Sequence, residues 1–317
     1  ITLIALLLLG ATTSTFATHL MGGSLNYTYV SFNAQTQTAT YDVVVTMYRR
    51  CDAGSSQFSP NINLGAYIEN TSNLNKVLFS STNIGPVVTS PVVLPSGGGC
   101  TFNPNVCVEK GVYSATIDLP LQAQGYHLMV ETCCRNTQIL NIDAAGNNLG
   151  MSFYAYVPPA FVNNSSPVFV DAPVPYLCVS DTTSLLNSVI DPDGDLLTYS
   201  FVSPFQDLTG AVQWNTPARS TYPIATTPYN PTFGVPPPFG PGGTAQINGA
   251  TGLTQYSPPG IGFYVVAVEI KEFRGTNPNP IGITRRDLQI IVITCPPNTS
   301  PNQAIDTDSN AVITTYN

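Results

Sequence analysis

Three aspartates at alternate positions, Asp191, Asp193 and Asp195, are the residues whose type and spacing point most directly to chemistry. They lie in the turn sequence DPDGD, and hard cations such as Ca²⁺ bind about six to eight clustered oxygen atoms. The turn therefore predicts a calcium site, completed by a glutamate from a neighbouring strand. Glu269 is the glutamate expected there, with Glu272 as the alternative. Asp-Pro-Asp-Gly also forms a turn without any ligand, so a metal-free turn stays open as the second interpretation.

The sequence predicts no catalytic site, and calcium is the one cofactor to which it points. The two histidines, His19 and His127, accompany no nucleophile motif such as G-x-S-x-G. No glycine pattern for nucleotide binding is present either. Carboxylates on the expected strands are too few for the paired acids that glycoside hydrolysis requires. We therefore expect a protein that acts by contact and is not an enzyme.

The segment GYHLMVETCCRN, residues 125–136, supplies the strand expected at 124–135, with one apolar and one polar face, because side chains alternate between the faces of a strand. The apolar face ends in Cys134, so this cysteine should point into the core, whereas Cys133 points outward. The inward and outward sets are Tyr126, Leu128, Val130, Thr132 and Cys134, against His127, Met129, Glu131, Cys133 and Arg135. The strand at 41–51 likewise ends in a core-facing Cys51. Two core faces that each end in a cysteine predict a Cys51–Cys134 disulfide.

The remaining cysteines complete a set of seven, which behind an export-type segment indicates an oxidising compartment and structural disulfides. Cys100 and Cys107 flank a short loop and most simply bond to each other. Cys178 and Cys295 open and close the C-terminal half with no cysteine between them, so they pair if that half folds independently. Cys133 is then free or forms a bridge between subunits.

Period-two hydrophobic segments separated by Gly, Pro and Asn turns predict an all-β protein made of two tandem immunoglobulin-like β-sandwich domains. Residues 18–160 form the first domain, and residues 161–295 form a second, Ig/cadherin-like domain. Strands of the first domain are expected at 24–32, 38–50, 63–70, 75–82, 86–94, 108–118, 124–135 and 150–157. Residues 296–317 are expected to be a linker and a tail strand. Residues 1–17 are expected to be an export signal or, as the alternative, a retained N-terminal assembly segment.

The charge composition excludes two classes of partner. The net charge is −8 with only 10 Lys+Arg, so no basic stripe exists to neutralise the phosphates of a nucleic acid. The same deficit argues against attraction to anionic lipid, and no stable membrane insertion of the mature chain is expected. Only 9% of residues are charged, and an uncharged polar surface of this kind is typical of secreted and cell-surface modules.

A Pro- and Gly-rich excursion at 204–243 is too long for a plain connector in a compact domain. Aromatic side chains on a loop stack on sugar rings or anchor a protein interface. The interface candidates in this excursion are Trp214, Tyr222, Tyr229, Phe233 and Phe239. The sequence favours packing on the chain's own domain, or a contact between subunits, over sugar binding.

Several blocks, taken in order, resemble the N-terminal region of large Bacteroidota surface proteins. These blocks are THLMGGSLNYTYV, VVVTMYRRC, GYHLMVETCCRN, IDPDGDLLTYSF, GFYVVAVEIKEFR and RRDLQIIVITC. The proteins that they resemble are gliding-motility-associated, adhesin-like proteins exported by type IX secretion, and the resemblance spans nearly all of residues 18–295. It implies a surface-attached β protein in adhesion or motility, with no known catalytic residue. The family tends to have a cysteine where this chain has Val202 and Ser203, which would explain the odd count.

Together these observations predict a secreted, non-enzymatic protein of the cell surface. It is expected to be a structural subunit of an extracellular filament, or an adhesin, that acts in surface attachment or gliding. Self-association is the expected partnership, with a surface glycan or protein as a further target. The alternative is a glycan-binding module or an accessory domain of a larger secreted protein.

Overall fold

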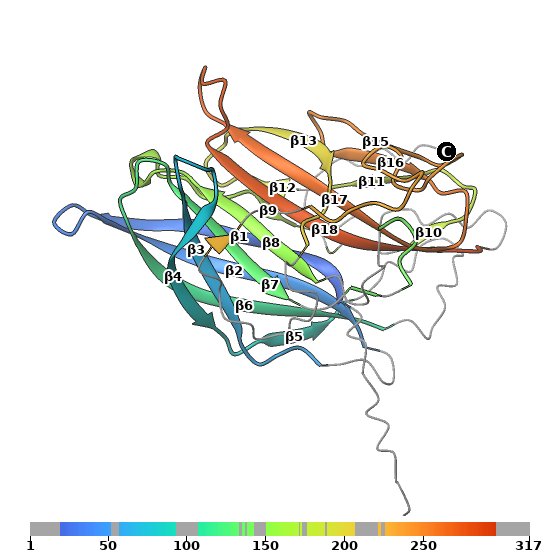
Figure 1. The fold of residues 1–317 in the computed structure, drawn as a ribbon, viewed down its shortest axis with the longest axis horizontal. Helices are drawn as coiled ribbons and strands as arrows, with labels where there is room; N and C mark the ends of the chain where they lie inside the picture. The colour runs from blue at the N-terminus through green and yellow to red at the C-terminus, as the bar shows by residue number, and fades with distance from the viewer. Residues whose placement is uncertain are drawn as a thin grey trace, which may run out of the picture.

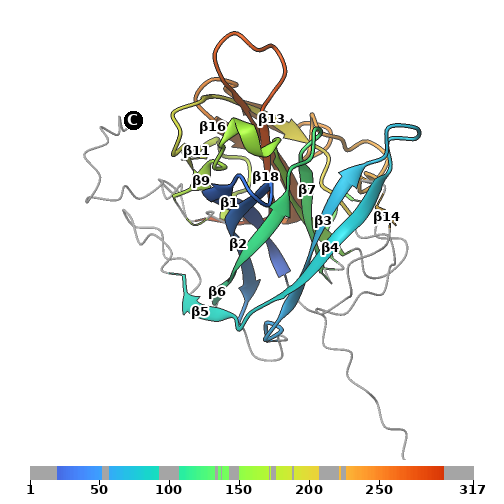
Figure 2. The same cartoon turned by 90° about the vertical axis from the view of Figure 1, so that its left-hand side faces the viewer.

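The computed structural model describes residues 20–51, 57–92, 107–132, 135–136, 138–142, 150–170, 172, 176–187, 189–206, 221–222 and 226–295. Within these ranges the protein is almost entirely β-structure, and the single helical element is a 3₁₀ turn, η1 (Ala160–Val162). The all-β prediction is therefore confirmed. Figures 1 and 2 show the strands curling into layers, with β17 and β18 as a long hairpin along one side.

The N-terminal strands form two layers of antiparallel strands (Figure 2). One layer has the order β5-β6-β2-β1, and the other has the order β4-β3-β7-β8. Their bounds are β1 (Leu20–Asn33), β2 (Thr38–Arg50), β3 (Ile62–Glu69), β4 (Lys76–Ile84), β5 (Val88–Pro91), β6 (Val108–Pro120), β7 (Tyr126–Thr132) and β8 (Met151–Val157). Each of the eight strands predicted here from period-two patterns has an observed counterpart.

The C-terminal strands surround the hairpin of β17 and β18. Their bounds are β9 (Val168–Phe169), β10 (Tyr176–Cys178), β11 (Thr183–Leu186), β12 (Val189–Ile190), β13 (Leu196–Val202), β14 (Thr221–Tyr222), β15 (Thr244–Ile247), β16 (Leu253–Ser257), β17 (Gly262–Phe273) and β18 (Gly282–Ile293). Strand β13 pairs with β17, while β11-β16-β15 and β12-β9 form two small separate sheets. Strand β14 joins the far edge of the N-terminal layer by pairing with β4.

Strand β18 connects the two groups of strands into one sheet. One edge of β18 pairs with β17 from Gly262↔Val292 to Glu272↔Gly282. Along its length β18 also pairs with β8, β1 and β10. Gly22 of β1 has φ +130°, and a Cβ there would lie 1.9 Å from the Asp287 carbonyl oxygen, so only glycine permits this approach. The large sheet includes strands from both sides of the predicted domain boundary at residues 160 and 161. The division into two domains therefore stays a prediction.

The main core lies between the two N-terminal layers. Val43, Val45 and Met47 of β2, which share the predicted core face with Cys51 because they alternate with it, are fully buried there, as are Leu128 and Val130 of β7. A second core packs β17 and β18 against the small sheets, with Tyr256, Tyr264 and Ile290 among its members. The period-two assignment of these core faces is therefore confirmed.

The outer face of β7 is not exposed, which corrects the prediction of a polar outward face. Met129 packs with Tyr67, Tyr154 and Phe205, and His127 and Glu131 are also buried. Arg135, just beyond the strand, is 3% exposed and binds both carboxylate oxygens of Asp287 on β18, at 2.8 and 2.5 Å. Part of this cover is the segment after β13, because Arg135 donates to the Phe205 carbonyl at 2.9 Å and Ser152 of β8 donates to the Gln206 carbonyl at 3.0 Å.

The disulfides partly correct the sequence prediction. Cys51 bonds to Cys107, so the predicted Cys51–Cys134 and Cys100–Cys107 pairs are both wrong. The reason is register: Arg50↔Val108 ends the β2–β6 ladder, which places Cys51 directly opposite Cys107 with a Cα–Cα distance of 4.9 Å. The Cys178–Cys295 prediction is confirmed. Cys100, Cys133 and Cys134 lie outside the described residues.

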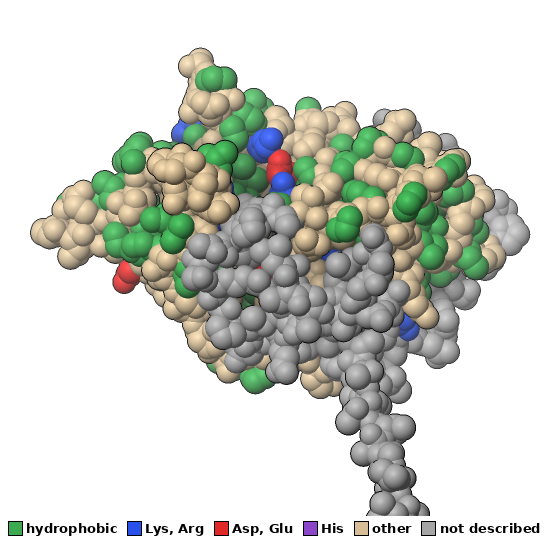
Figure 3. All heavy atoms as spheres, viewed as in Figure 1, with side chains coloured by type: hydrophobic (Ala, Val, Ile, Leu, Met, Phe, Trp, Pro, Cys, Tyr) green, Lys and Arg blue, Asp and Glu red, His purple; other side chains and the backbone are tan. Residues whose placement is uncertain are grey.

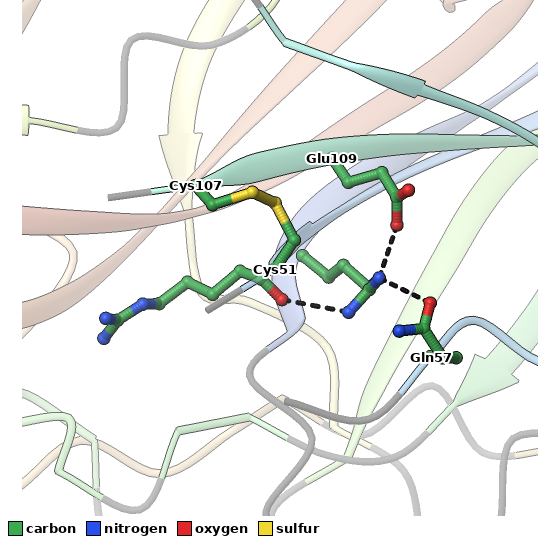
Figure 4. The surroundings of a disulfide bond; sticks show 6 residues. Cys51, Gln57, Cys107 and Glu109 are labelled. Atoms are coloured by element: carbon green, nitrogen blue, oxygen red, sulfur yellow. Dashed lines mark hydrogen bonds and ion pairs between the residues drawn. A yellow bond between two sulfur atoms is a disulfide. The ribbon is translucent and has the colours of Figure 1, made fainter. Parts of the chain in front are cut away.

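Buried polar contacts extend the Cys51–Cys107 crosslink (Figure 4). Arg49 donates to Glu109 at 2.8 Å and to Gln57 at 2.7 Å, and a further nitrogen donates to the Arg50 carbonyl at 3.2 Å. Arg49 is 3% exposed, and its guanidinium lies over the Phe58 ring. The end of the β2–β6 ladder is therefore fixed by one covalent bond and by a charged network.

Replacing both Cys51 and Cys107 with serine should lower the free energy of unfolding by roughly 2–4 kcal/mol, because the unfolded chain regains the freedom of a long loop. Urea denaturation of the variant and of the parent measures this loss. Peptide mapping without reductant provides the direct check, with a Cys51–Cys107 linked peptide expected. A Cys51–Cys134 linked peptide would contradict the observed pairing.

His127 is held neutral inside the protein. Its Nδ1 lies 2.9 Å from the Tyr154 hydroxyl, its ring stacks on Tyr154, and the Tyr156 ring lies beside it. Burial, together with the positive charge of Lys76, lowers the pKa of His127 to about 4, although the Glu69 carboxylate, 4.0 Å away, opposes both effects. The unfolded chain, with an ordinary pKa of 6.5, therefore takes up the proton first as the pH falls.

This difference predicts acid sensitivity between pH 6.5 and 4. The contribution of His127 to stability is intact above pH 6.5 and falls by about 1.4 kcal/mol per pH unit toward pH 4. Replacing His127 with glutamine should flatten the curve of unfolding free energy against pH in this window. Because carboxylates titrate in both proteins, the informative quantity is the difference between the two curves. Parallel curves would contradict the prediction.

Candidate functional site

The aspartate turn connects β12 to β13, and its backbone is organised by Asp191. The Oδ1 atom of Asp191 accepts hydrogen bonds from the backbone N–H groups of Asp193 and Asp195, both at 3.0 Å. Gly194 has φ +75°, a conformation that glycine adopts without strain. One carboxylate oxygen from each of the three aspartates lies within 4.8 Å of the other two. The turn thus brings together the oxygen cluster that the sequence predicted.

Arg274, immediately after β17, lies against this cluster. Its Nε and Nη2 atoms donate to the two carboxylate oxygens of Asp195 at 2.7 and 2.6 Å, and Nη2 lies 3.4 Å from Asp193 Oδ2. The Asp195 side chain is 3% exposed, whereas that of Arg274 is 36% exposed. Register explains the contact: Leu196↔Phe273 starts the β13–β17 ladder, so the residues flanking this pair are neighbours.

The segment that follows η1 completes the surroundings of the guanidinium. Arg274 donates to the Val162 carbonyl at 2.7 Å and to Asn164 Oδ1 at 3.0 Å. The backbone N–H of Ser165 donates to Asp193 at 2.6 Å. Asn164 also donates to the Tyr27 hydroxyl of β1 at 3.0 Å. The turn, the end of β17 and the connection after β8 therefore meet at one point.

Glu272 is the glutamate that the structure brings to the aspartates. It is fully buried, and its Oε1 accepts a hydrogen bond from Asn164 at 2.7 Å. Burial, together with the negative charges of Asp191, Asp195 and Asp193, raises the pKa of Glu272 to about 8, although the hydrogen bond from Asn164 opposes this increase. Opposite it, a Cβ on Gly282 would lie 1.9 Å from Glu272 Oε2, so only glycine leaves room for this carboxyl.

Glu269, the glutamate predicted from sequence, has different partners. It pairs with Arg285 at 2.5 Å and with Lys271 at 3.3 Å. Glu269 and Glu272 are three residues apart on one strand, so they point to opposite faces of the sheet. Glu272 shares its face with Val268 and Ile270, which pack against Val189 just before the turn. This alternation was a signal in the sequence that would have favoured Glu272.

The aromatic interface candidates of the excursion mostly pack inward. Phe239 is 2% exposed and makes edge-to-face contacts with Tyr256 and Tyr264, so it is not available to a partner. Phe233 packs against the same cluster. Tyr229 is half-buried against Ile139, Ile142 and Val265. Tyr222, in β14, pairs through its backbone with Lys76 of β4. Trp214 lies outside the described residues, as do residues 1–17 and 296–317.

Comparisons with protein-family models, with curated proteins and with solved structures find no match for this chain. The family resemblance of the sequence therefore remains an expectation. In the described part of the chain no helix has the length and apolar character needed to cross a membrane.

Replacing Arg274 with alanine should lower the free energy of unfolding by roughly 2 kcal/mol, because Asp195 then remains buried without its cation. Urea denaturation in metal-free buffer measures the loss. Lys271→Ala is the matched control, since it also removes a cation near the end of β17 but leaves Glu269 paired with Arg285. The control should cost less than about 1 kcal/mol. Equal losses in the two variants would show that the Arg274 contacts contribute no special stability.

Proposed function

We propose that this protein is a secreted, non-enzymatic structural or adhesive protein of the cell surface. The main supporting observation is the pair of disulfides at strand ends, Cys51–Cys107 at the end of the β2–β6 ladder and Cys178–Cys295 beside the β10–β18 ladder. Disulfides form and persist in oxidising compartments outside the cytosol. Crosslinks at these positions also resist fraying of the sheet under load.

The distribution of charge supports a function by contact. The chain has only 10 Lys+Arg, and among the residues that the structure describes Arg49, Lys76, Arg135 and Arg286 are buried. Few cations are therefore left for the surface, and the coloured part of the face in Figure 3 shows only scattered Lys, Arg, Asp and Glu side chains. A surface of this composition suits direct packing against another protein more than electrostatic capture of a charged ligand.

Exposed aliphatic residues on the small sheets give this surface a local candidate for contact. Ile190 and Val168 are cross-strand partners with exposures of 62% and 41%. Leu186 and Leu253 form a second such pair, each at 40%. Because aliphatic side chains gain free energy when they leave water, these pairs favour association between copies of the chain.

The sequence resemblance extends this proposal to a biological setting. Similarity to gliding-motility-associated surface proteins supports a role in attachment or gliding, after export by type IX secretion. The inward packing of Phe233 and Phe239 removes two residues from any sugar-stacking surface, which favours a structural role over a glycan-binding module. The contact target then is a second copy of the chain or another surface protein.

Negative-stain microscopy of the protein purified from cells tests this proposal, with fibres of one repeating subunit or particles bound to surfaces as the expected result. Monodisperse particles that neither polymerise nor adhere would contradict it. The variant Ile190→Lys should weaken self-association roughly tenfold, because it places a charge in the aliphatic contact. Val88→Lys is the control, since Val88 is 68% exposed and lies on β5, at the far end of the large sheet from these small sheets. Melting curves establish that both variants are folded.

A further inference from the structure

We propose that the aspartate turn and Glu272 form a calcium site in which the Arg274 side chain substitutes for the ion when calcium is absent. The inference does not depend on the proposed function, since the site would exist whether or not the chain forms filaments. It rests on two independent observations, the oxygen atoms that surround the Arg274 guanidinium and the buried acid oxygens that this guanidinium leaves without a partner.

Six oxygen atoms from two segments, residues 162–164 and the aspartate turn, lie around one cationic group. Asp195 contributes two, Asp193 and Asn164 contribute one side-chain oxygen each, and the carbonyls of Val162 and Asn163 contribute the others. The distances from the guanidinium nitrogens range from 2.6 to 3.4 Å. Carboxylate, amide and carbonyl oxygens in this number are the ligand set that Ca²⁺ prefers. The cage is therefore built for a cation, and Arg274 is the cation that the chain itself provides.

Arg274 does not neutralise all of the negative charge of the aspartate turn. Among the described residues, Asp191 Oδ2 and Glu272 Oε2 are buried atoms without a hydrogen-bond donor. Glu272 is fully buried and adjoins the cage through Asn164, which donates to Glu272 Oε1 and accepts from Arg274. A buried acid oxygen without a partner is costly, and the three clustered aspartates alone outnumber the one guanidinium. A divalent ion would satisfy both orphaned oxygens and better balance the charge.

The ligand set favours calcium over magnesium. Magnesium demands near-ideal octahedral geometry and keeps much of its water, whereas calcium accepts irregular cages of protein oxygens. The oxygens here come from a turn, a strand end and an irregular connection, which is an irregular arrangement. The Arg274 side chain is 36% exposed, so it can turn into solvent when the ion enters.

Calcium bound here would stiffen the junction between the two groups of strands. Val162, Asn163 and Asn164 belong to the connection between β8 and β9, and Asn164 also contacts Tyr27 of β1. The aspartates precede β13, and Glu272 ends β17. One ion would therefore fix the connection to both the N-terminal sandwich and the C-terminal hairpin.

Calorimetric titration of the full chain with CaCl2, after removal of metal with EDTA, tests the inference. The parent protein should bind one Ca²⁺ per chain and melt at a higher temperature in calcium than in EDTA. Asp191→Asn and Glu272→Gln should each weaken binding roughly tenfold, because each replaces a carboxyl ligand with a neutral amide. Asp118→Asn is the control and should leave binding unchanged, since Asp118 is an exposed carboxylate on β6 that bonds to Thr40.

The decisive variant is Arg274→Ala. It should bind calcium roughly tenfold more tightly than the parent, because the ion no longer competes with the guanidinium. Calcium should also restore much of the melting temperature that this variant loses in EDTA. If Glu272→Gln fails to fold, Asp193→Asn replaces it as the ligand variant. An absence of binding in both the parent and Arg274→Ala would overturn the inference, as would binding that none of the ligand substitutions weakens. In either case the cluster is a metal-free clamp around Arg274.

Discussion

Strand β18 shares its hydrogen-bonding groups among four other strands, and the arrangement of the whole molecule depends on that sharing. A buried strand must satisfy its backbone N–H and C=O groups, and β18 does so with β17 along one edge and with β8, β1 and β10 along its length. Gly22 permits the close approach of β1. The buried Arg135–Asp287 pair then attaches the segment after β7 to the same strand. Residues near both ends of the described chain consequently belong to one continuous sheet.

The same architecture explains why a chain with so few charged residues uses several of them internally. Arg49, Arg135 and Arg285 each pair with a carboxylate that is mostly shielded from water. Removing one partner of such a pair leaves a buried charge uncompensated, so these contacts enforce specific strand neighbours more than they add net stability. The surface that remains is poor in charge, which agrees with a protein that functions by packing against other molecules.

The aspartate turn lies where three parts of this architecture converge. Its position follows from the β13–β17 register, which brings Arg274 and Glu272 beside it, and from the connection after η1, whose carbonyls point to the same place. A cation, whether guanidinium or calcium, is the natural link there, because oxygen atoms from separate segments repel one another without a positive charge between them. Stiffness at this junction would matter for a subunit that transmits force along a filament or between a cell and a surface.

The sequence by itself determined the strand class, the approximate strand bounds and the core-facing residues of β2 and β7, since period-two alternation is a local property of the chain. It also identified the aspartate turn and the Cys178–Cys295 pair, which needed only local spacing and elimination. It could not determine that Cys51 lies opposite Cys107, that the second face of β7 is covered, or that β18 joins both groups of strands. Those facts depend on the register between strands far apart in the chain, and alternation specifies which face a residue occupies without specifying its neighbour across the ladder. Glu272 combines both kinds of information. Alternation in the sequence specified the face of β17 on which it lies, whereas the pairing of β13 with β17 brought it to the aspartate turn.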